Sequence, residues 1–228
     1  MYFLSPLDIM LLLIAFGISI SAQVMVKSTF ARYSKVPSQR GMTGAQVAYN
    51  ILRLNNVNDV EIEERRGLLS DHYDPIKKKL RLSSEIYHST SVAALGVAAH
   101  EAGHAIQHKV GYAPLNLRHG LFPIANLGSN MAMPFFFIGL IFSSGFLMDV
   151  GIYLFLAAVA FQVITLPVEF NASKRAIYQL EAGGFLTRNE IGAARKVLSA
   201  AALTYVAATA VTLMHLVRLL LIRGAVDD

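Results

Sequence analysis

Four long apolar stretches separate the polar parts of this chain, at residues 7–26, 124–142, 150–168 and 200–222. Each has about 20 residues, and a helix that rises about 1.5 Å per residue then spans a hydrocarbon core of about 30 Å. The second and third stretches are separated only by SSGFLMD, which predicts a tight helical hairpin. The first lacks the basic start and cleavage site of a secretory signal, so we interpret it as an uncleaved anchor. The pattern therefore predicts four transmembrane helices.

A different pattern fills the long polar segment between the first two apolar stretches. In TGAQVAYNILRLNN, Thr43 and Gln46 stand at the spacing of a capping box, and apolar residues follow every three or four positions, which predicts an amphipathic helix. VNDVEIEER and IKKKLRLSS alternate apolar and polar residues, as half-buried strands do. The turn-forming residues of GLLSDHYDP lie between them, so we expect a β-hairpin. A further helix is expected from about residue 89, ending before Gly111.

Composition supports a mainly α integral membrane protein with a small α/β unit. Of the 228 residues, 54% are hydrophobic and 15% are charged, a balance that is unusual for a soluble domain. The chain has no cysteine, so disulfides and thiolate metal sites are excluded, and any metal must be bound by nitrogen and oxygen. The 20 Lys and Arg residues exceed the 15 Asp and Glu residues, an excess that suits the cytoplasmic flanks of membrane helices. We expect no nucleic-acid partner.

The basic residues also indicate how the chain crosses the membrane. They follow the first apolar stretch and lie between the third and fourth, whereas the hairpin turn has only the acidic Asp149. By the positive-inside rule both large polar segments lie in the cytoplasm, although Arg218 and Arg223 run against it. We therefore expect five parts in chain order: a transmembrane anchor (1–26), a cytoplasmic α/β unit (27–123), a transmembrane hairpin (124–168), a cytoplasmic segment (169–199) and a transmembrane helix (200–228).

The stretch VAAHEAGHAIQH places three chemically active side chains on the second predicted helix of the α/β unit. His100 and His104 are four residues apart, so their imidazoles stand one turn apart on the same face. Glu101 lies at the flank of that face. This is the H-E-x-x-H arrangement, in which two histidines hold zinc and the glutamate takes a proton from water. A helix whose polar residues simply face water would account for the motif taken alone.

A zinc site needs a third ligand, and two residues compete for that position. His108 continues the four-residue spacing, but three ligands from one straight helix fan out along it instead of converging. The further glycine and histidine of a metzincin motif are also absent. Glu169, in LPVEFNASKRA, follows the transmembrane hairpin, which returns the chain to the membrane face that it left. We therefore expect His100, His104 and Glu169 to bind one Zn²⁺ ion.

Three segments together, HEAGHAIQH, EFNASKRA and LLSDHYDPIKKKLRLSS, resemble the bacterial integral-membrane zinc-dependent neutral metallopeptidases of the YugP-like family. That family is in turn similar to the gluzincins related to the CAAX prenyl protease and to the heat-shock membrane protease. The resemblance covers nearly the whole chain. It implies zinc ligation by His100, His104 and Glu169. It also implies that Glu101 is the general base. From this resemblance together with the distribution of basic residues, we expect a protein of the bacterial inner membrane with its active site on the cytoplasmic side.

One position departs from the gluzincin pattern. In those relatives the ligand glutamate opens an E-x-x-x-D sequence, whereas this chain has Ser173 where the aspartate would stand. The role of orienting a ligand histidine must then fall to Ser173, Asn171 or another residue.

The implied activity is that of a zinc metalloendopeptidase, which hydrolyses peptide bonds of proteins at the cytoplasmic face of the membrane. Tyr205 is the first candidate for stabilising the oxyanion, with Arg175 and His215 as alternatives. An interfacial aromatic anchor explains Tyr205 equally well, and a hydrogen bond between helices explains His215 better.

The strand KKKLRLSS is the candidate surface for an extended substrate, held main chain to main chain as in gluzincin-like proteases. Its three lysines, residues 77–79, fit a patch facing solvent or lipid headgroups equally well. Asp71, His72 and Asp74 are metal-ligand types, but turn capping explains them more simply. The expected partners are polypeptide substrates in or near the membrane, the lipid bilayer, and a regulatory or adaptor membrane protein.

Two other functions stay open at this point. One is a zinc-binding membrane scaffold without protease activity, which would have no need of Glu101. The other is a zinc hydrolase that acts on a non-peptide substrate at the bilayer, although H-E-x-x-H chemistry is mostly peptide chemistry.

Overall fold

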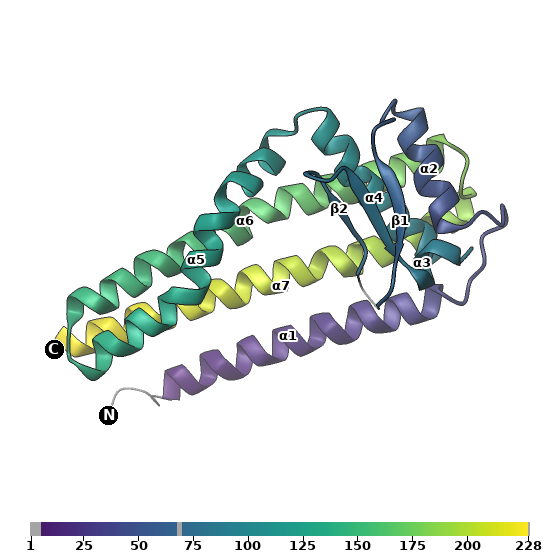
Figure 1. The fold of residues 1–228 in the computed structure, drawn as a ribbon. Coiled ribbons are helices and arrows are strands. Elements are labelled where there is room, and N and C mark those ends of the chain that lie inside the picture. Colours follow the sequence, from purple (N-terminus) through teal and green to yellow (C-terminus); the bar gives the residue numbers. More distant parts are fainter. Residues whose placement is uncertain (1–5, 68–69, 228) are drawn as a thin grey trace. The chain divides into compact units, whose positions relative to one another are not determined.

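The structure, a computed structural model, describes residues 6–67 and 70–227 (Figure 1). Helices dominate it, and a small sheet lies between the second and third of them along the chain. The elements are α1 (Pro6–Tyr33), α2 (Gly44–Leu54), β1 (Glu61–Arg65), β2 (His72–Asp74), β3 (Lys79–Ser83), α3 (Ser84–His88), α4 (Val92–Lys109), α5 (Ala113–Ile141), α6 (Gly145–Ala182) and α7 (Arg188–Asp227). The predicted fold class, mainly α with a small α/β part, is confirmed.

The chain forms two compact units, and each draws on helices that are far apart in the sequence. One, which we call the helical unit, comprises Met1–Gln23, Asn116–Pro167 and Thr204–Asp228. The other, the α/β unit, comprises Val24–Leu115 and Val168–Leu203. The helices α1, α6 and α7 each contribute residues to both units.

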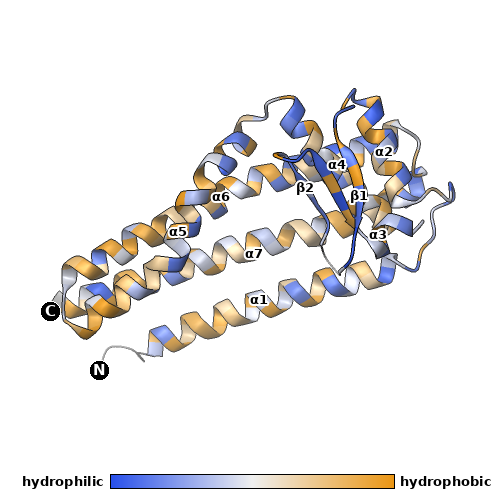
Figure 2. Cartoon of the chain, in the orientation of Figure 1, coloured by the Kyte–Doolittle hydropathy of each residue, from blue (hydrophilic) through white to orange (hydrophobic). Residues whose placement is uncertain are grey.

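The four predicted spans correspond to helices that are long and apolar enough to cross a membrane. They are Pro6–Tyr33, Ala113–Ile141, Gly145–Ala182 and Arg188–Val226. In the helical unit large apolar side chains point outward, and Phe16, Phe142 and Phe146 are each more than 60% exposed. Figure 2 shows apolar residues running along these helices, in contrast to the hydrophilic residues of β2. Such an outward apolar surface suits lipid better than water.

The turn between α5 and α6 is as short as the sequence predicts, because only residues 142–144 separate the two helices. Glycine allows the two helices to approach closely. A Cβ atom on Gly151 would lie 2.7 Å from the carbonyl oxygen of Ala132, a distance that side chains do not tolerate. The predicted helical hairpin is therefore confirmed.

The two arginines that run against the positive-inside rule are paired with carboxylates within the helical unit. Arg218 Nε lies 3.2 Å from Asp8, and Arg223 Nε lies 2.8 Å from Asp149. Asp8 is buried. Because each arginine has a carboxylate beside it, neither adds a free positive charge to this end of the helices.

The three strands of the α/β unit pair in the order β1-β3-β2. β1 is parallel to β3, and β2 is antiparallel to β3. The expected hairpin between the first and last strand is therefore wrong. The hairpin is formed instead by β2 and β3, with Tyr73 opposite Leu80. Asp74 still caps the turn as expected, because its carboxylate accepts hydrogen bonds from the backbone of Ile76 and Lys77.

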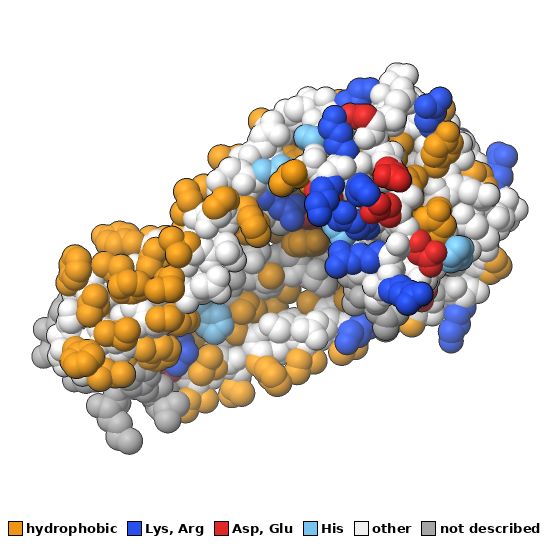
Figure 3. Space-filling view, in the orientation of Figure 1, with side chains coloured by type: hydrophobic (Ala, Val, Ile, Leu, Met, Phe, Trp, Pro, Cys, Tyr) orange, Lys and Arg blue, Asp and Glu red, His pale blue; other side chains and the backbone are white. Residues whose placement is uncertain are grey.

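Charged side chains over the sheet form pairs of opposite sign, and Figure 3 shows them intermingled on this part of the surface. Lys78 is paired with Asp59, and Lys79 is hydrogen-bonded to Glu63. This bond lowers the pKa of Glu63 and raises the pKa of Lys79. Arg81 contacts both Glu63 and Asp74. The charges of Lys78 and Lys79 are therefore paired and do not form a free basic patch.

The core of the α/β unit is formed by α2, α4 and the sheet together with the parts of α6 and α7 that belong to this unit. Val47 and Ile51 on one face of α2 are fully buried, as are Leu80 and Leu82 on alternate positions of β3. The predicted capping box at the start of α2 is present.

The second predicted helix begins later than expected. A short helix, α3, occupies residues 84–88, and α4 starts after Ser91, whose hydroxyl accepts a hydrogen bond from the backbone of Ala94. Gly111, just beyond the end of α4, has a φ of +64°, which few residues other than glycine adopt.

Candidate metal centre

The helix α4 can lie directly against α6 because many of its buried residues are alanine or glycine. Ala98, Ala99 and Ala102 are fully buried. A Cβ atom on Gly103 would lie 2.8 Å from the carbonyl oxygen of Ala172 on α6, so this position requires glycine. The close approach of the two backbones places side chains of α4 within reach of side chains on α6.

His100, His104 and Glu169 meet where the two helices touch. His100 Nε2 lies 3.2 Å from Glu169 Oε2, and His104 Nε2 lies 3.6 Å from the same oxygen. One ligand atom from each residue lies within 4.8 Å of the others. In the part of the chain that the structure describes, this is the one group of three side chains suited to a metal ion. The sequence prediction that these three residues converge agrees with this geometry.

Each histidine has a hydrogen bond at its second ring nitrogen. His100 Nδ1 lies 3.1 Å from the hydroxyl oxygen of Ser173, and His104 Nδ1 donates to Gln107 Oε1 at 3.0 Å. These bonds turn both Nε2 atoms toward Glu169. Hydrogen bonds of this kind fix the tautomer and orientation of histidine ligands. Ser173, which stands at the position of the aspartate in the expected gluzincin pattern, therefore contacts His100 in this structure.

Gln107 is the residue that sequence reasoning missed. It is fully buried, and its amide nitrogen donates to the carbonyl oxygen of Val168 and to Asn171 Oδ1, at 2.8 Å and 3.0 Å. Asn171 Oδ1 also accepts a hydrogen bond from Arg175 Nε. Asn171 thus supports His104 through Gln107 rather than directly. The sequence spacing could have identified it, because Gln107 lies three residues after His104, and side chains three positions apart on a helix can contact one another.

The electrostatic environment favours a positive charge at this point. Burial alone would lower the pKa of His104, but its hydrogen bond with Glu169 and the negative charges of Glu101 and Glu169 raise that pKa above its usual value. Glu101 is buried and follows His100 directly on α4. Two carboxylates that favour a protonated imidazole also favour a bound cation.

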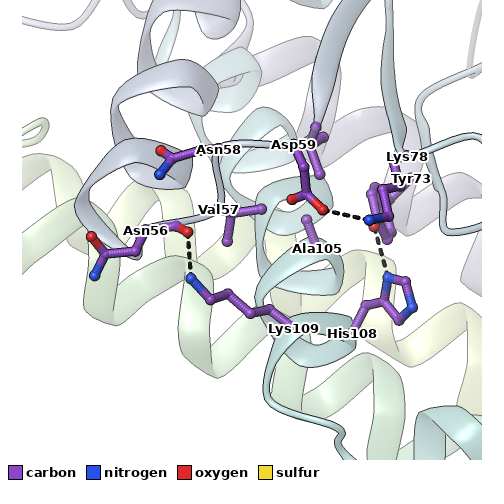
Figure 4. Close-up of a pocket in the computed structure, with 10 residues that line it drawn as sticks. Asn56, Val57, Asn58, Asp59, Tyr73, Lys78, Ala105, His108 and Lys109 are labelled. Carbon is purple, nitrogen blue, oxygen red and sulfur yellow. Dashed lines mark hydrogen bonds and ion pairs between the residues drawn. The ribbon is translucent and has the colours of Figure 1, made fainter.

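His108 forms a hydrogen bond with a residue outside the candidate metal centre. Its Nδ1 atom lies 2.8 Å from the hydroxyl oxygen of Tyr73 on β2. Both residues line a pocket of about 440 Å³ beside α4, and Figure 4 shows the two side chains pointing toward one another. Burial raises the pKa of Tyr73 to about 12. The expectation that His108 is not a metal ligand agrees with this arrangement.

The strand expected to bind substrate has no free edge. β3 is hydrogen-bonded to β1 on one side and to β2 on the other, so KKKLRLSS cannot pair with a further chain. The free edges belong to β1 and β2. Alternation along a strand shows which face is buried, but it does not show which strand is central.

Of the proposed oxyanion donors, Arg175 lies in the α/β unit and its side chain is hydrogen-bonded to Asn171. Tyr205 and His215 belong to the helical unit, so their roles stay predictions.

The comparisons with known proteins extend over both units. The model of a family described as "Putative neutral zinc metallopeptidase" matches residues 8–224. A protein of Bacillus subtilis (strain 168) named "Putative membrane protease YugP" is 50% identical over 216 residues, which cover 95% of this chain and 96% of that protein. No solved structure matches the chain.

Proposed function

Because the chain belongs to this family of neutral zinc metallopeptidases, we propose that it is a membrane-embedded zinc metalloendopeptidase. It hydrolyses peptide bonds of proteins at the cytoplasmic face of the bacterial inner membrane. The observation that carries the proposal is the convergence of His100, His104 and Glu169 beside the buried Glu101.

The donor set fits a catalytic zinc ion. Two imidazole nitrogens and one carboxylate oxygen are the ligands of many zinc hydrolases, and three protein ligands leave a fourth position free. The small distances between the donor atoms fit a single ion. When bound, zinc lowers the pKa of a water molecule to about 7 and polarises the carbonyl group of the substrate.

Residues of the chain itself would supply the proton transfer, the positioning of the ligands and the stabilisation of the oxyanion. The carboxylate of Glu101 accepts a proton from the attacking water and delivers it to the nitrogen of the leaving amine. Ser173 and Gln107 hold the two imidazoles with Nε2 facing Glu169. Tyr205 is the proposed donor to the oxyanion, with Arg175 and His215 as the alternatives.

An extended polypeptide would pair with β2 rather than with β3. β2 has a free edge, and Tyr73 links it to α4 through His108. Main-chain pairing accepts substrates of many sequences, because its hydrogen bonds do not depend on the substrate's side chains. We expect the substrates to be proteins in or near the membrane, and an adaptor or regulatory membrane protein stays a prediction.

The test compares casein cleavage and zinc content for the full-length wild type and Glu101→Gln. The proposal predicts that both bind zinc and that only the wild type cleaves. Equal cleavage by the two proteins would contradict the role of Glu101. Bound zinc without cleavage of casein or of membrane proteins would favour the scaffold, or a hydrolase with a non-peptide substrate.

A further inference from the structure

The helices α1, α6 and α7 enclose a groove that the proposed chemistry does not use. Two neighbouring pockets of about 560 Å³ and 640 Å³ make it up. Both are lined by Arg195, Ser199 and Leu203, which are spaced four residues apart on one face of α7. Residues of α6 complete the first pocket and residues of α1 complete the second. All of these residues lie in the α/β unit.

The lining of this groove combines positive charge with apolar surface. The first pocket adds Lys174 to Arg195, and the second adds Arg32 and Lys196. Apolar side chains, among them that of Phe170, line the same pockets. Neither pocket has a carboxylate among its described lining residues. A ligand that fits this lining has an anionic group and an apolar body.

The basic residues of the groove differ from those over the sheet. Lys78 and Lys79 are each paired with a carboxylate. Among the residues that the structure describes, Lys174, Arg195 and Lys196 form no ion pair. Their charge is therefore available to an external anion.

The position of the groove along the chain indicates which anion it meets. It lies where the apolar stretches of α1 and α6 end, near residues 26 and 168, and where that of α7 begins, near residue 200. Lipid headgroups lie at this level of a membrane helix, and basic pockets between helices on the cytoplasmic side bind anionic headgroups.

We propose that this groove binds an anionic phospholipid of the inner leaflet. The phosphate group lies between Lys174 and Arg195, and an acyl chain lies against Phe170 and Leu203. Ser173 lines the same pocket and is hydrogen-bonded to His100, so the groove and the candidate metal centre share a wall.

The test measures lipid binding directly, and it therefore gives an answer whether or not the protein is a protease. The full-length protein in a neutral detergent is titrated with phosphatidylglycerol or phosphatidylcholine, and bound lipid is counted by native mass spectrometry. One basic residue near an anionic surface contributes about a fivefold gain in affinity, so the double variant Lys174→Gln/Arg195→Gln should bind phosphatidylglycerol about 25-fold more weakly. Wild type should prefer phosphatidylglycerol to phosphatidylcholine.

Two matched variants separate this site from a general charge effect. Arg65→Gln/Arg66→Gln removes two exposed positive charges outside the groove and should bind like wild type. Lys174→Arg/Arg195→Lys keeps both charges and should restore binding. Unchanged binding by the double glutamine variant, an equal loss in the control, or displacement of the lipid by millimolar inorganic phosphate would each overturn the proposal.

Discussion

Gln107→Leu is the substitution that most sharply tests how the candidate metal centre is held together. The side chain is fully buried and bonds to three groups: His104 Nδ1, Val168 O and Asn171 Oδ1. Asn171 keeps its bond from Arg175. His104 Nδ1 has no other hydrogen-bond partner among the described residues.

The expected magnitude follows from that loss. A buried polar group without a partner costs about 1–3 kcal/mol, and loss of a group that orients a metal ligand lowers metal affinity by about 10- to 100-fold. We therefore expect Gln107→Leu to bind zinc at least about tenfold more weakly than wild type, because His104 loses both its orientation and its fixed tautomer. The free energy of unfolding of Gln107→Leu should be lower than that of wild type by about 1–3 kcal/mol.

The assay is competition for zinc between the purified protein and a chelator of known affinity. Gln179→Leu is the matched control, because Gln179 is half-buried in the same unit and is hydrogen-bonded to Asn55, away from the metal-type group. It should change stability without changing zinc affinity. Wild-type zinc affinity in Gln107→Leu, measured on folded protein, would refute the positioning role.

Three further predictions concern packing, burial and charge. Gly103→Ala should lower the midpoint of thermal unfolding by destabilising the α4–α6 contact by about 1–3 kcal/mol, whereas Gly96→Ala on the same helix has room and should not lower it. Tyr73→Phe should remove a component with a midpoint near pH 12 from an ultraviolet titration of the tyrosines. Because the pKa of Tyr73 is raised in the folded protein, its contribution to the free energy of unfolding is complete below pH 10 and is lost as the pH rises toward 12. Asp8→Asn should lower the thermal midpoint because it leaves the half-buried Arg218 without its carboxylate, at a cost of about 1–3 kcal/mol, and Arg218→Gln added to it should recover part of the loss.

The membrane helices could be predicted because the signal is local. A stretch of about 20 apolar residues needs no tertiary partner to be recognised. The ion pairs of Arg218 with Asp8 and of Arg223 with Asp149 could not be predicted, since Asp8 and Arg218 are 210 positions apart in the sequence. Their pairing explains two charges that the positive-inside rule alone leaves unexplained.

The sheet shows where local pattern stops being informative. Alternation predicted β1 and β3, but it carries no information on which strands are neighbours. β2 has only three residues, too few for a period of two to be visible, and its Asp and His residues resemble those of a turn. The central position of β3 moves the proposed substrate edge to β2.

The three metal-type residues could be inferred from spacing and topology together. His100 and His104 follow from helical geometry, and Glu169 follows from a hairpin that returns the chain to the same side. Gln107 could not be singled out, because a glutamine on a helix more often faces water. Its burial depends on the close approach of α4 and α6, which Gly103 permits.

The most direct test of the central claim is the zinc content of three purified full-length proteins: wild type, Glu169→Ala and His108→Ala. The account predicts one zinc ion per chain for wild type and for His108→Ala, and loss of zinc from Glu169→Ala, because Glu169 completes the group formed with His100 and His104. Full zinc retention by Glu169→Ala together with loss from His108→Ala would contradict it.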